Sequence, residues 1–147
     1  MKFNFKTIDQ MTGREMFCVE RLRLETFVTE QKITLPELDD QDLKAIHVYQ
    51  LNENKTNALA TCRIFQNETG EWVLGRVAVS KQARGQGLCK KMLEAVHKYL
   101  KEEKNASSIS CHAQHYVQKF YESLGYETQG EVFQEANIDH IMMIKKL

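Results

Sequence analysis

A strand, a short loop with two glycines and a helix follow one another in residues 72–100, and this stretch most constrains the fold. Residues 72–79 read Trp-Val-Leu-Gly-Arg-Val-Ala-Val, which has the apolar content of a buried strand. From Leu88 onward apolar residues recur with the 3.6-residue period of an amphipathic helix, which we expect to end near Glu103. A helix that begins on a glycine loop leaves backbone amides without hydrogen-bond partners, so this stretch predicts a binding site for an anion.

Two well-known phosphate-binding motifs do not fit this loop. A P-loop needs Gly-Lys-Ser/Thr, but a Leu-Cys pair follows Gly87, and a dinucleotide fingerprint needs a glycine or alanine where Lys90 stands. The pattern that remains is Gln82-x-x-Gly85-x-Gly87 after a Val-Ala-Val strand. Each charge-assisted bond from a loop amide would contribute about 1.5–3 kcal/mol, several times the roughly 0.3–1 kcal/mol from the helix dipole. Backbone donors would therefore hold the anion.

Length and composition favour one ordinary α/β domain, which we expect to span residues 1–147. The chain has 42% hydrophobic residues, and its 20 basic residues balance 20 acidic ones, so we expect no nucleic acid and no membrane among its partners. No segment is apolar enough for a signal peptide or a membrane span, which favours a cytoplasmic protein. The four cysteines form no Cys-x-x-Cys pair, so we expect reduced, mostly buried thiols and no metal site.

The remaining pattern predicts an α/β (α+β) fold, in which helices flank a mixed sheet of six or seven strands. Thr12 and Glu15 have the spacing of a capping box, so a helix should begin at Gly13. A short helix at residues 117–124 should end at Gly125. A right-handed crossover should place the strand after the long helix parallel to residues 72–79. The other strands are expected at residues 3–8, 47–51, 58–65, 109–113, 131–135 and 140–145.

A second motif resembles a known family. Residues 120–126 read Phe-Tyr-Glu-Ser-Leu-Gly-Tyr and resemble the Phe-Tyr-x-x-x-Gly-Phe segment of the Gcn5-related N-acetyltransferases (GNAT), whose pyrophosphate loop the glycine pattern also resembles. Residues 60–63 and 131–142 resemble the small bacterial ElaA-like and YjcF-like branch. The resemblance implies the GNAT acyl-CoA N-acyltransferase fold. It also implies direct transfer of acetyl from acetyl-CoA to a primary amine in a ternary complex.

The resemblance further implies where acetyl-CoA binds. The pantetheine arm would pair with residues 77–79 like an extra strand, and the pyrophosphate would lie on the backbone of residues 84–89. A backbone N–H near Val79 would face the thioester oxygen, and Tyr121 would give a proton to the departing thiolate, with simple core packing as the alternative for Tyr121. The expected cofactor-binding residues are Val77, Ala78, Val79, Gln82, Arg84, Gly85, Gln86, Gly87, Leu88, Cys89, Gln114 and Tyr121.

No single residue stands out as the general base. A primary amine is mostly protonated at neutral pH, so the site must remove a proton or select the rare free base. Many relatives carry a glutamate on the fifth strand where this chain has Ile109, and Gln114 replaces a later asparagine. For each histidine a structural role is the alternative, and His112-x-x-His115 is too common a spacing to indicate a metal. The catalytic candidates are Tyr121, His112 and Glu30, with Glu135 and His140 as further bases acting through water.

The sequence does not identify the acceptor of the acetyl group. Arg23, Arg63 and Arg76 are expected to border the acceptor side, where they would bind a substrate carboxylate or, equally, form structural ion pairs with Glu30, Glu37 or Asp39. The acidic residues of segment 29–42 tilt the prediction slightly towards a cationic acceptor. A polyamine, an amino acid, an aminoglycoside-like compound and a protein amino group all fit.

Three alternatives accompany the main interpretation. Cys89 lies in the first helical turn, where a thiolate would be stabilised, so a covalent ping-pong route competes with direct transfer. Ile109 in the usual base position also allows a non-catalytic acyl-CoA-binding module, and a plain α/β scaffold without a ligand is the third possibility. The strands near the carboxyl terminus permit either a monomer or a homodimer.

Overall fold

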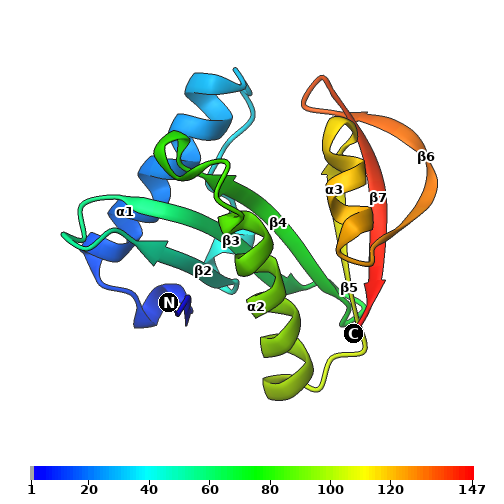
Figure 1. Ribbon diagram of the computed structural model, residues 1–147, viewed down its shortest axis with the longest axis horizontal. Coiled ribbons are helices and arrows are strands. Elements are labelled where there is room, and N and C mark those ends of the chain that lie inside the picture. Colours follow the sequence, from blue (N-terminus) through cyan, green and yellow to red (C-terminus); the bar gives the residue numbers. More distant parts are fainter. Residues whose placement is uncertain (1) are drawn as a thin grey trace.

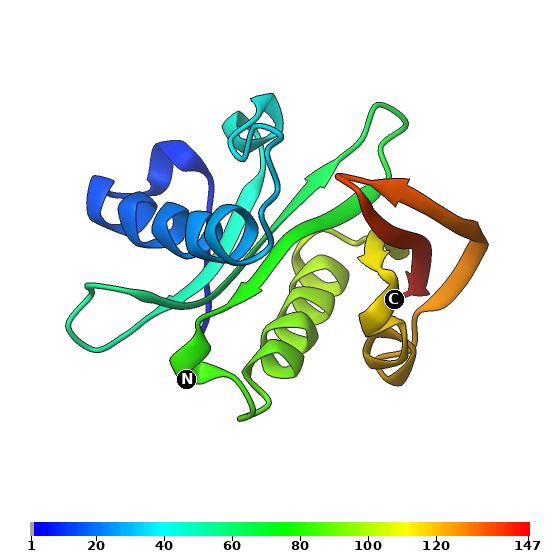
Figure 2. The same cartoon turned by 90° about the horizontal axis from the view of Figure 1, so that it is seen from above.

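The computed structural model describes residues 2–147, in which seven strands form one mixed sheet in the order β1-β2-β3-β4-β5-β7-β6 (Figure 1). The three α-helices of this part of the chain cover both faces, with α1 on one side and α2 and α3 on the other (Figure 2). The predicted fold class is confirmed. The elements are β1 Asn4–Lys6, α1 Gly13–Arg23, β2 Ile46–Leu51, β3 Ala58–Gln66, β4 Trp72–Val79, α2 Leu88–Glu103, β5 Ser108–Gln114, α3 Gln118–Ser123, β6 Glu127–Glu135 and β7 Ile138–Lys146.

Helix α1 begins where its capping box predicts. The Glu15 amide donates to Thr12 Oγ1 at 3.1 Å, and the Thr12 amide donates to Glu15 Oε1 at 2.8 Å. After Arg23 the helix continues as a wider π-helical segment, Leu24–Glu30. Such π-helical segments are rare in proteins, and those that occur often lie at functional sites. This segment extends from the end of α1 towards the glycine loop that precedes α2.

Strands β4 and β5 lie parallel, as predicted, but over a short distance. Their register pairs Trp72–Leu74 with Ile109–Cys111, and beyond Leu74 the two strands part (Figure 1). The register between β3 and β4 also shifts here, and Arg76 has a φ of 52°, which marks an irregularity in β4. Residues 75–79 therefore keep their ladder to β3 and have no strand partner on the β5 side within the described chain.

The main core lies between α2 and the sheet. Met92, Leu93 and Val96 of α2 are fully buried in one cluster with residues of β3, β4, β5 and β7. Gly125 has a φ of 94° and ends the short helix α3 as predicted. No helix of residues 2–147 is long and apolar enough to cross a membrane.

The two edge strands, β1 and β6, differ in length from their predictions for physical reasons. The strand predicted at residues 3–8 is limited to β1, because Thr7 caps a 3₁₀ turn at Ile8–Gln10 that ends the extended conformation. The strand predicted at residues 131–135 instead begins at Glu127. Gly130, with a φ of 77°, lets one strand bend and continue, and the register to β7 shifts between Gln129 and Phe133.

His97 of α2 makes the stability of the fold depend on pH. Burial and the nearby Lys145 lower the pKa of His97 from 6.5 to about 4, and its Nε2 lies 2.7 Å from the Tyr126 hydroxyl. The unfolded chain therefore binds more protons below pH 6.5. The associated stability is present above that pH and is lost as the pH falls towards 4.

Urea unfolding at pH 6.5 and 4.5 should show a loss of roughly 2 kcal/mol from this group alone. His97→Gln should reduce that loss. Burial alone would raise the pKa of Glu15, but hydrogen bonds from Thr12, Tyr49 and Lys6 lower it to about 2, so its contribution is lost mainly at lower pH. Identical pH dependence in the parent and the variant would contradict the role assigned to His97.

Candidate active site

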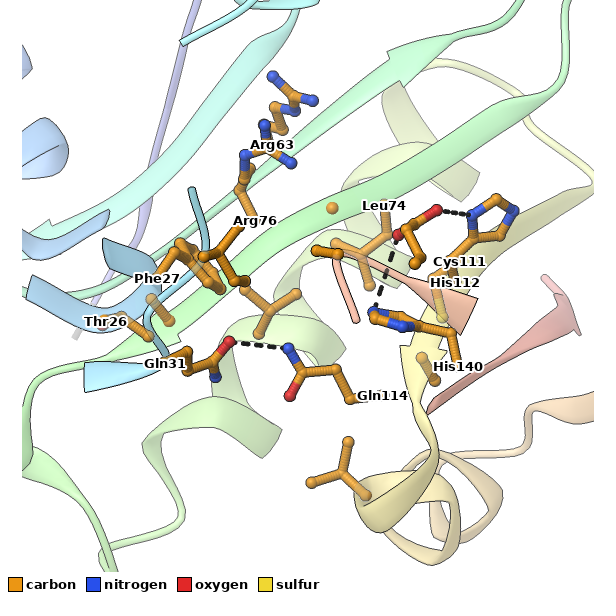
Figure 3. Close-up of a pocket in the computed structure, with 18 of the residues that line it drawn as sticks. Thr26, Phe27, Gln31, Arg63, Leu74, Arg76, Cys111, His112, Gln114 and His140 are labelled. Carbon is orange, nitrogen blue, oxygen red and sulfur yellow. Dashed lines mark hydrogen bonds and ion pairs between the residues drawn. The ribbon is translucent and has the colours of Figure 1, made fainter. Parts of the chain in front are cut away.

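A cleft of about 1110 Å³ opens where β4 and β5 part (Figure 3). Its lining runs from Arg84 of the glycine loop, past Val77 and Val79 of β4, to the turn that joins β6 and β7. The volume is slightly above the range of about 300–1,000 Å³ that is usual for small-molecule sites. Of the predicted cofactor-binding residues, the cleft is lined by Val77, Ala78, Val79, Arg84, Cys89, Gln114 and Tyr121.

The glycine loop at one end of the cleft has free backbone donors. Gly85 and Gly87 adopt φ values of 78° and 73°, which side chains other than hydrogen disfavour, and Gly87 caps the 16-residue helix α2. Within residues 2–147, no backbone hydrogen bond of the loop uses the amides of Gly85, Gln86 or Gly87. These amides and the first turn of α2 are available to an anionic ligand.

The side chains of three predicted loop residues lie elsewhere. Gln82, Gln86 and Leu88 line a separate groove with Phe5 and Tyr99, on the side of α2 that faces β1. These side chains are therefore not directed into the cleft, and the predicted contacts of the loop with the cofactor depend on its backbone. The sequence pattern places the loop correctly, but it does not indicate which way each side chain points.

Arg84 and Glu30 form an ion pair across the mouth of the cleft. Arg84 Nη1 and Nη2 each lie 2.8 Å from one Glu30 carboxylate oxygen, and Arg84 Nε donates to the Val79 carbonyl at 3.0 Å. The hydrogen bonds from Arg84 lower the pKa of Glu30. A carboxylate held in this way takes up a proton less readily, so these contacts oppose the catalytic role predicted for Glu30.

Arg23 does not face the cleft. Its side chain is 1% exposed, with Nε 2.6 Å from Glu37 Oε2 and Nη1 2.9 Å from Asp42 Oδ1. A guanidinium buried against two carboxylates is not accessible to substrate. The predicted substrate-binding role of Arg23 is therefore wrong, and the structural alternative describes it.

Arg63 and Arg76 line the cleft but are also paired. Arg63 Nη1 lies 2.7 Å from Asp39 Oδ1, and Arg76 Nε lies 3.1 Å from Glu37 Oε2. Together with Arg23, these residues fix segment 31–45 beside the sheet. Because the carboxylates of this segment at the cleft are already matched by guanidinium groups, they no longer favour a cationic acceptor.

Tyr121 and Cys89 meet the cleft from the side of the helices. Tyr121 packs edge-on against Phe120 and Tyr126, and burial raises the pKa of its hydroxyl well above 10, so the hydroxyl stays protonated and able to donate. Burial also raises the pKa of Cys89 to about 11. The stabilised thiolate expected at Cys89 is therefore wrong, which disfavours the covalent route.

Two glutamines connect the walls of the cleft. Gln114 Nε2, at the end of β5, donates to Gln31 Oε1 at 2.9 Å, just after the π-helical segment (Figure 3). Sequence reasoning gave Gln31 no role in the site. No local pattern could have paired two residues that lie 83 positions apart.

Three of the predicted proton acceptors come together at the other end of the cleft. His112 Nδ1 lies 3.1 Å from Glu135 Oε1, and His140 Nε2 lies 3.7 Å from Glu135 Oε2 (Figure 3). These three residues come from three different segments of the sheet, and all three line the cleft. Within residues 2–147 no group of His, Cys, Asp or Glu side chains is arranged to hold a metal ion.

The cleft and its glycine loop indicate the family of enzymes to which this fold belongs. Residues 21–147 match the family described as an acetyltransferase (GNAT) domain, so the chain belongs to the GNAT acetyltransferase family. UPF0039 protein C11D3.02c of Schizosaccharomyces pombe is 29% identical over 144 residues, which are 97% of this chain and 95% of that protein. Relatives therefore occur outside bacteria as well.

Solved structures show the same fold. The crystal structure of an acyl-CoA N-acyltransferase from Pseudomonas aeruginosa matches with a TM-score of 0.90 and 28% identity, over 99% of both chains. The crystal structure of Escherichia coli ElaA matches with a TM-score of 0.89 and 23% identity, over 98% of both chains. The mixed seven-stranded sheet is thus the acyl-CoA N-acyltransferase fold, and the resemblance to ElaA is confirmed.

Proposed function

We propose that the chain is an acetyl-CoA-dependent N-acetyltransferase that acts on a primary amine by direct attack in a ternary complex, with residues 1–147 as one catalytic domain. The observation that carries the proposal is the arrangement of the cleft. Unpaired amides of the glycine loop lie at one end, the hydroxyl-bearing Tyr121 lines its side, and proton-accepting side chains lie at the other end. The name of the Pseudomonas relative supports the acyl-CoA donor.

The cleft suits an acyl-CoA thioester in three ways. The amides of Gly85, Gln86 and Gly87 match a pyrophosphate, since each is a donor without a partner in the described chain. The edge of β4 after Leu74 has no strand partner on the β5 side, so its backbone groups match the amides of a pantetheine arm, although the Val79 carbonyl already accepts from Arg84 Nε. The volume of about 1110 Å³ leaves space for an acceptor beside that arm.

Direct transfer needs few chemical groups from the protein. The free amine attacks the thioester carbon, a C–N bond forms and the C–S bond breaks. The attacking nitrogen loses one proton to water, while Tyr121 gives its proton to the thiolate and regains one from water. Cys89 keeps its proton because of its raised pKa, so it is poorly suited to accept the acetyl group itself.

Calorimetric titration with acetyl-CoA and an assay for free CoA thiol test this proposal. We expect one acetyl-CoA to bind per chain, and thiol release to accelerate when an accepted amine is added. The amine panel should include a polyamine, an amino acid, an aminoglycoside and a lysine-containing peptide. Binding without amine-dependent thiol release would favour the non-catalytic module, and the absence of binding would contradict both functions.

A further inference from the structure

The register of the sheet places His112, His140 and Glu135 on one face, at the end of the cleft away from the glycine loop. His140 of β7 pairs with Gln114 of β5, two residues after His112, and residues two apart on a strand share a face. Glu135 of β6 pairs with Ile138 of β7, two residues before His140. Figure 3 shows both imidazoles joined by dashed lines to the carboxylate between them.

The hydrogen bonds of His140 determine which of its nitrogens is basic. Its Nδ1 lies 2.8 Å from the Ile138 carbonyl oxygen, and because a carbonyl oxygen only accepts, Nδ1 carries the proton. In the neutral ring the lone pair is then on Nε2. No residue within 2–147 donates a hydrogen bond to Nε2, and Glu135 Oε2 at 3.7 Å is itself an acceptor. The residue is only 6% exposed, so the structure holds a proton acceptor without a donor beside the cleft.

Glu135 is placed to stabilise this ring once it is protonated. Protonation of His140 creates an Nε2–H group that faces Glu135 Oε2, while Glu135 Oε1 already accepts from His112 Nδ1 at 3.1 Å. Phe133 stacks on His140 at 6.0 Å between ring centroids and contacts His112 edge-on at 5.1 Å. In the serine-protease triad a carboxylate holds Nδ1–H and leaves Nε2 as the base. Here the Ile138 carbonyl holds Nδ1–H, and Glu135 lies on the Nε2 side, where it stabilises the protonated ring.

Glu135 also differs from the other acidic residues of the cleft in the charge of the groups that face it. Four carboxylates line it within the described chain, and Glu30, Glu37 and Asp39 each face a guanidinium group. Glu135 faces only the two imidazoles. An incoming ammonium group is therefore attracted to this end of the cleft, beside His140 Nε2.

We propose that His140 is the general base that takes the proton from the acceptor ammonium, and that Glu135, held in place by His112, stabilises the imidazolium that forms. This inference rests on the proposed N-acetyltransferase function. The ammonium group gives one proton to His140 Nε2, and the lone pair that remains attacks the thioester carbon. After the C–S bond breaks, the nitrogen loses a second proton to water, Tyr121 protonates the thiolate, and His140 returns its proton to solvent.

Two acceptors of equal size test the inference. Ethylamine is almost entirely ammonium at neutral pH, whereas methoxyamine is almost entirely free base and needs no proton removed before attack. His140→Gln should lower kcat/KM for ethylamine at least about tenfold and should leave methoxyamine within about threefold of the parent. His115→Gln, an exposed histidine outside the cleft lining, is the matched control and should change neither rate.

Glu135→Gln provides a second variant that does not disturb the core, because its side chain is 47% exposed. It should lower the ethylamine rate selectively as well, by a smaller factor. An equal fall for both amines, or no fall for either, would contradict the role of His140 while leaving N-acetyl transfer intact. A parent protein that binds acetyl-CoA but acetylates neither of these two amines nor any amine of the panel would instead contradict the proposed function.

Discussion

Acetyl-CoA binding should fall at least about 100-fold when Gly85 and Gly87 are both replaced by glutamate, because at least two charge-assisted amide bonds of about 1.5–3 kcal/mol each are lost. Both glycines have positive φ values, and no atom lies within 4 Å of the point that a Cβ would occupy, so glutamate side chains would extend into open space in front of α2. They would also place two negative charges where the pyrophosphate is expected. Calorimetry with acetyl-CoA measures the loss.

A matched variant separates this effect from backbone strain and net charge. Gly70 and Gly130 also have positive φ values with open space around them, and they lie in the β3–β4 turn and in β6, away from the glycine loop. The Gly70→Glu, Gly130→Glu protein should bind acetyl-CoA like the parent. Equal binding by the loop variant and the parent would show that the glycine loop does not hold the pyrophosphate.

The elements around this loop could be predicted because their signals are local. Strand β4 and helix α2 have the predicted bounds, since each is a continuous run with one hydrophobic period. The start of α1 follows from one capping box, and the end of α3 follows from one glycine. The π-helical segment after Arg23 had no such signal, because its residues do not differ in type from those of an ordinary helix.

The cleft itself depends on contacts between distant segments, which no local pattern contains. Strands β4 and β5 separate next to an irregularity at Arg76, which has a positive φ. Arginine rarely adopts a positive φ, so the sequence does not predict this irregularity. Arg23 is expected to border the acceptor side, yet Glu37 and Asp42 bury it. Glu135 and His140 are among the candidate bases named from the sequence, but only the register of β6 and β7 shows that they meet.

Of the substitutions predicted to affect turnover, removal of the Tyr121 hydroxyl oxygen should have the largest effect. Tyr121→Phe keeps the ring that packs against Phe120 and Tyr126, and no residue within 2–147 is hydrogen-bonded to the hydroxyl. The fold should therefore be retained. If the hydroxyl protonates the departing thiolate, kcat should fall between about 100-fold and 10,000-fold, the usual range for a general acid, while acetyl-CoA binding changes little.

Steady-state thiol release and calorimetry on the same preparation distinguish this role from simple packing. A KM effect with unchanged kcat would indicate that Tyr121 contributes only to binding. Tyr99→Phe is the control, because Tyr99 stacks on Phe5 in the separate groove beside β1 and should tolerate the loss of its hydroxyl. If both variants turn over like the parent, Tyr121 is a core residue, and the proton for the thiolate must come from water, for which the cleft between β4 and β5 provides the path.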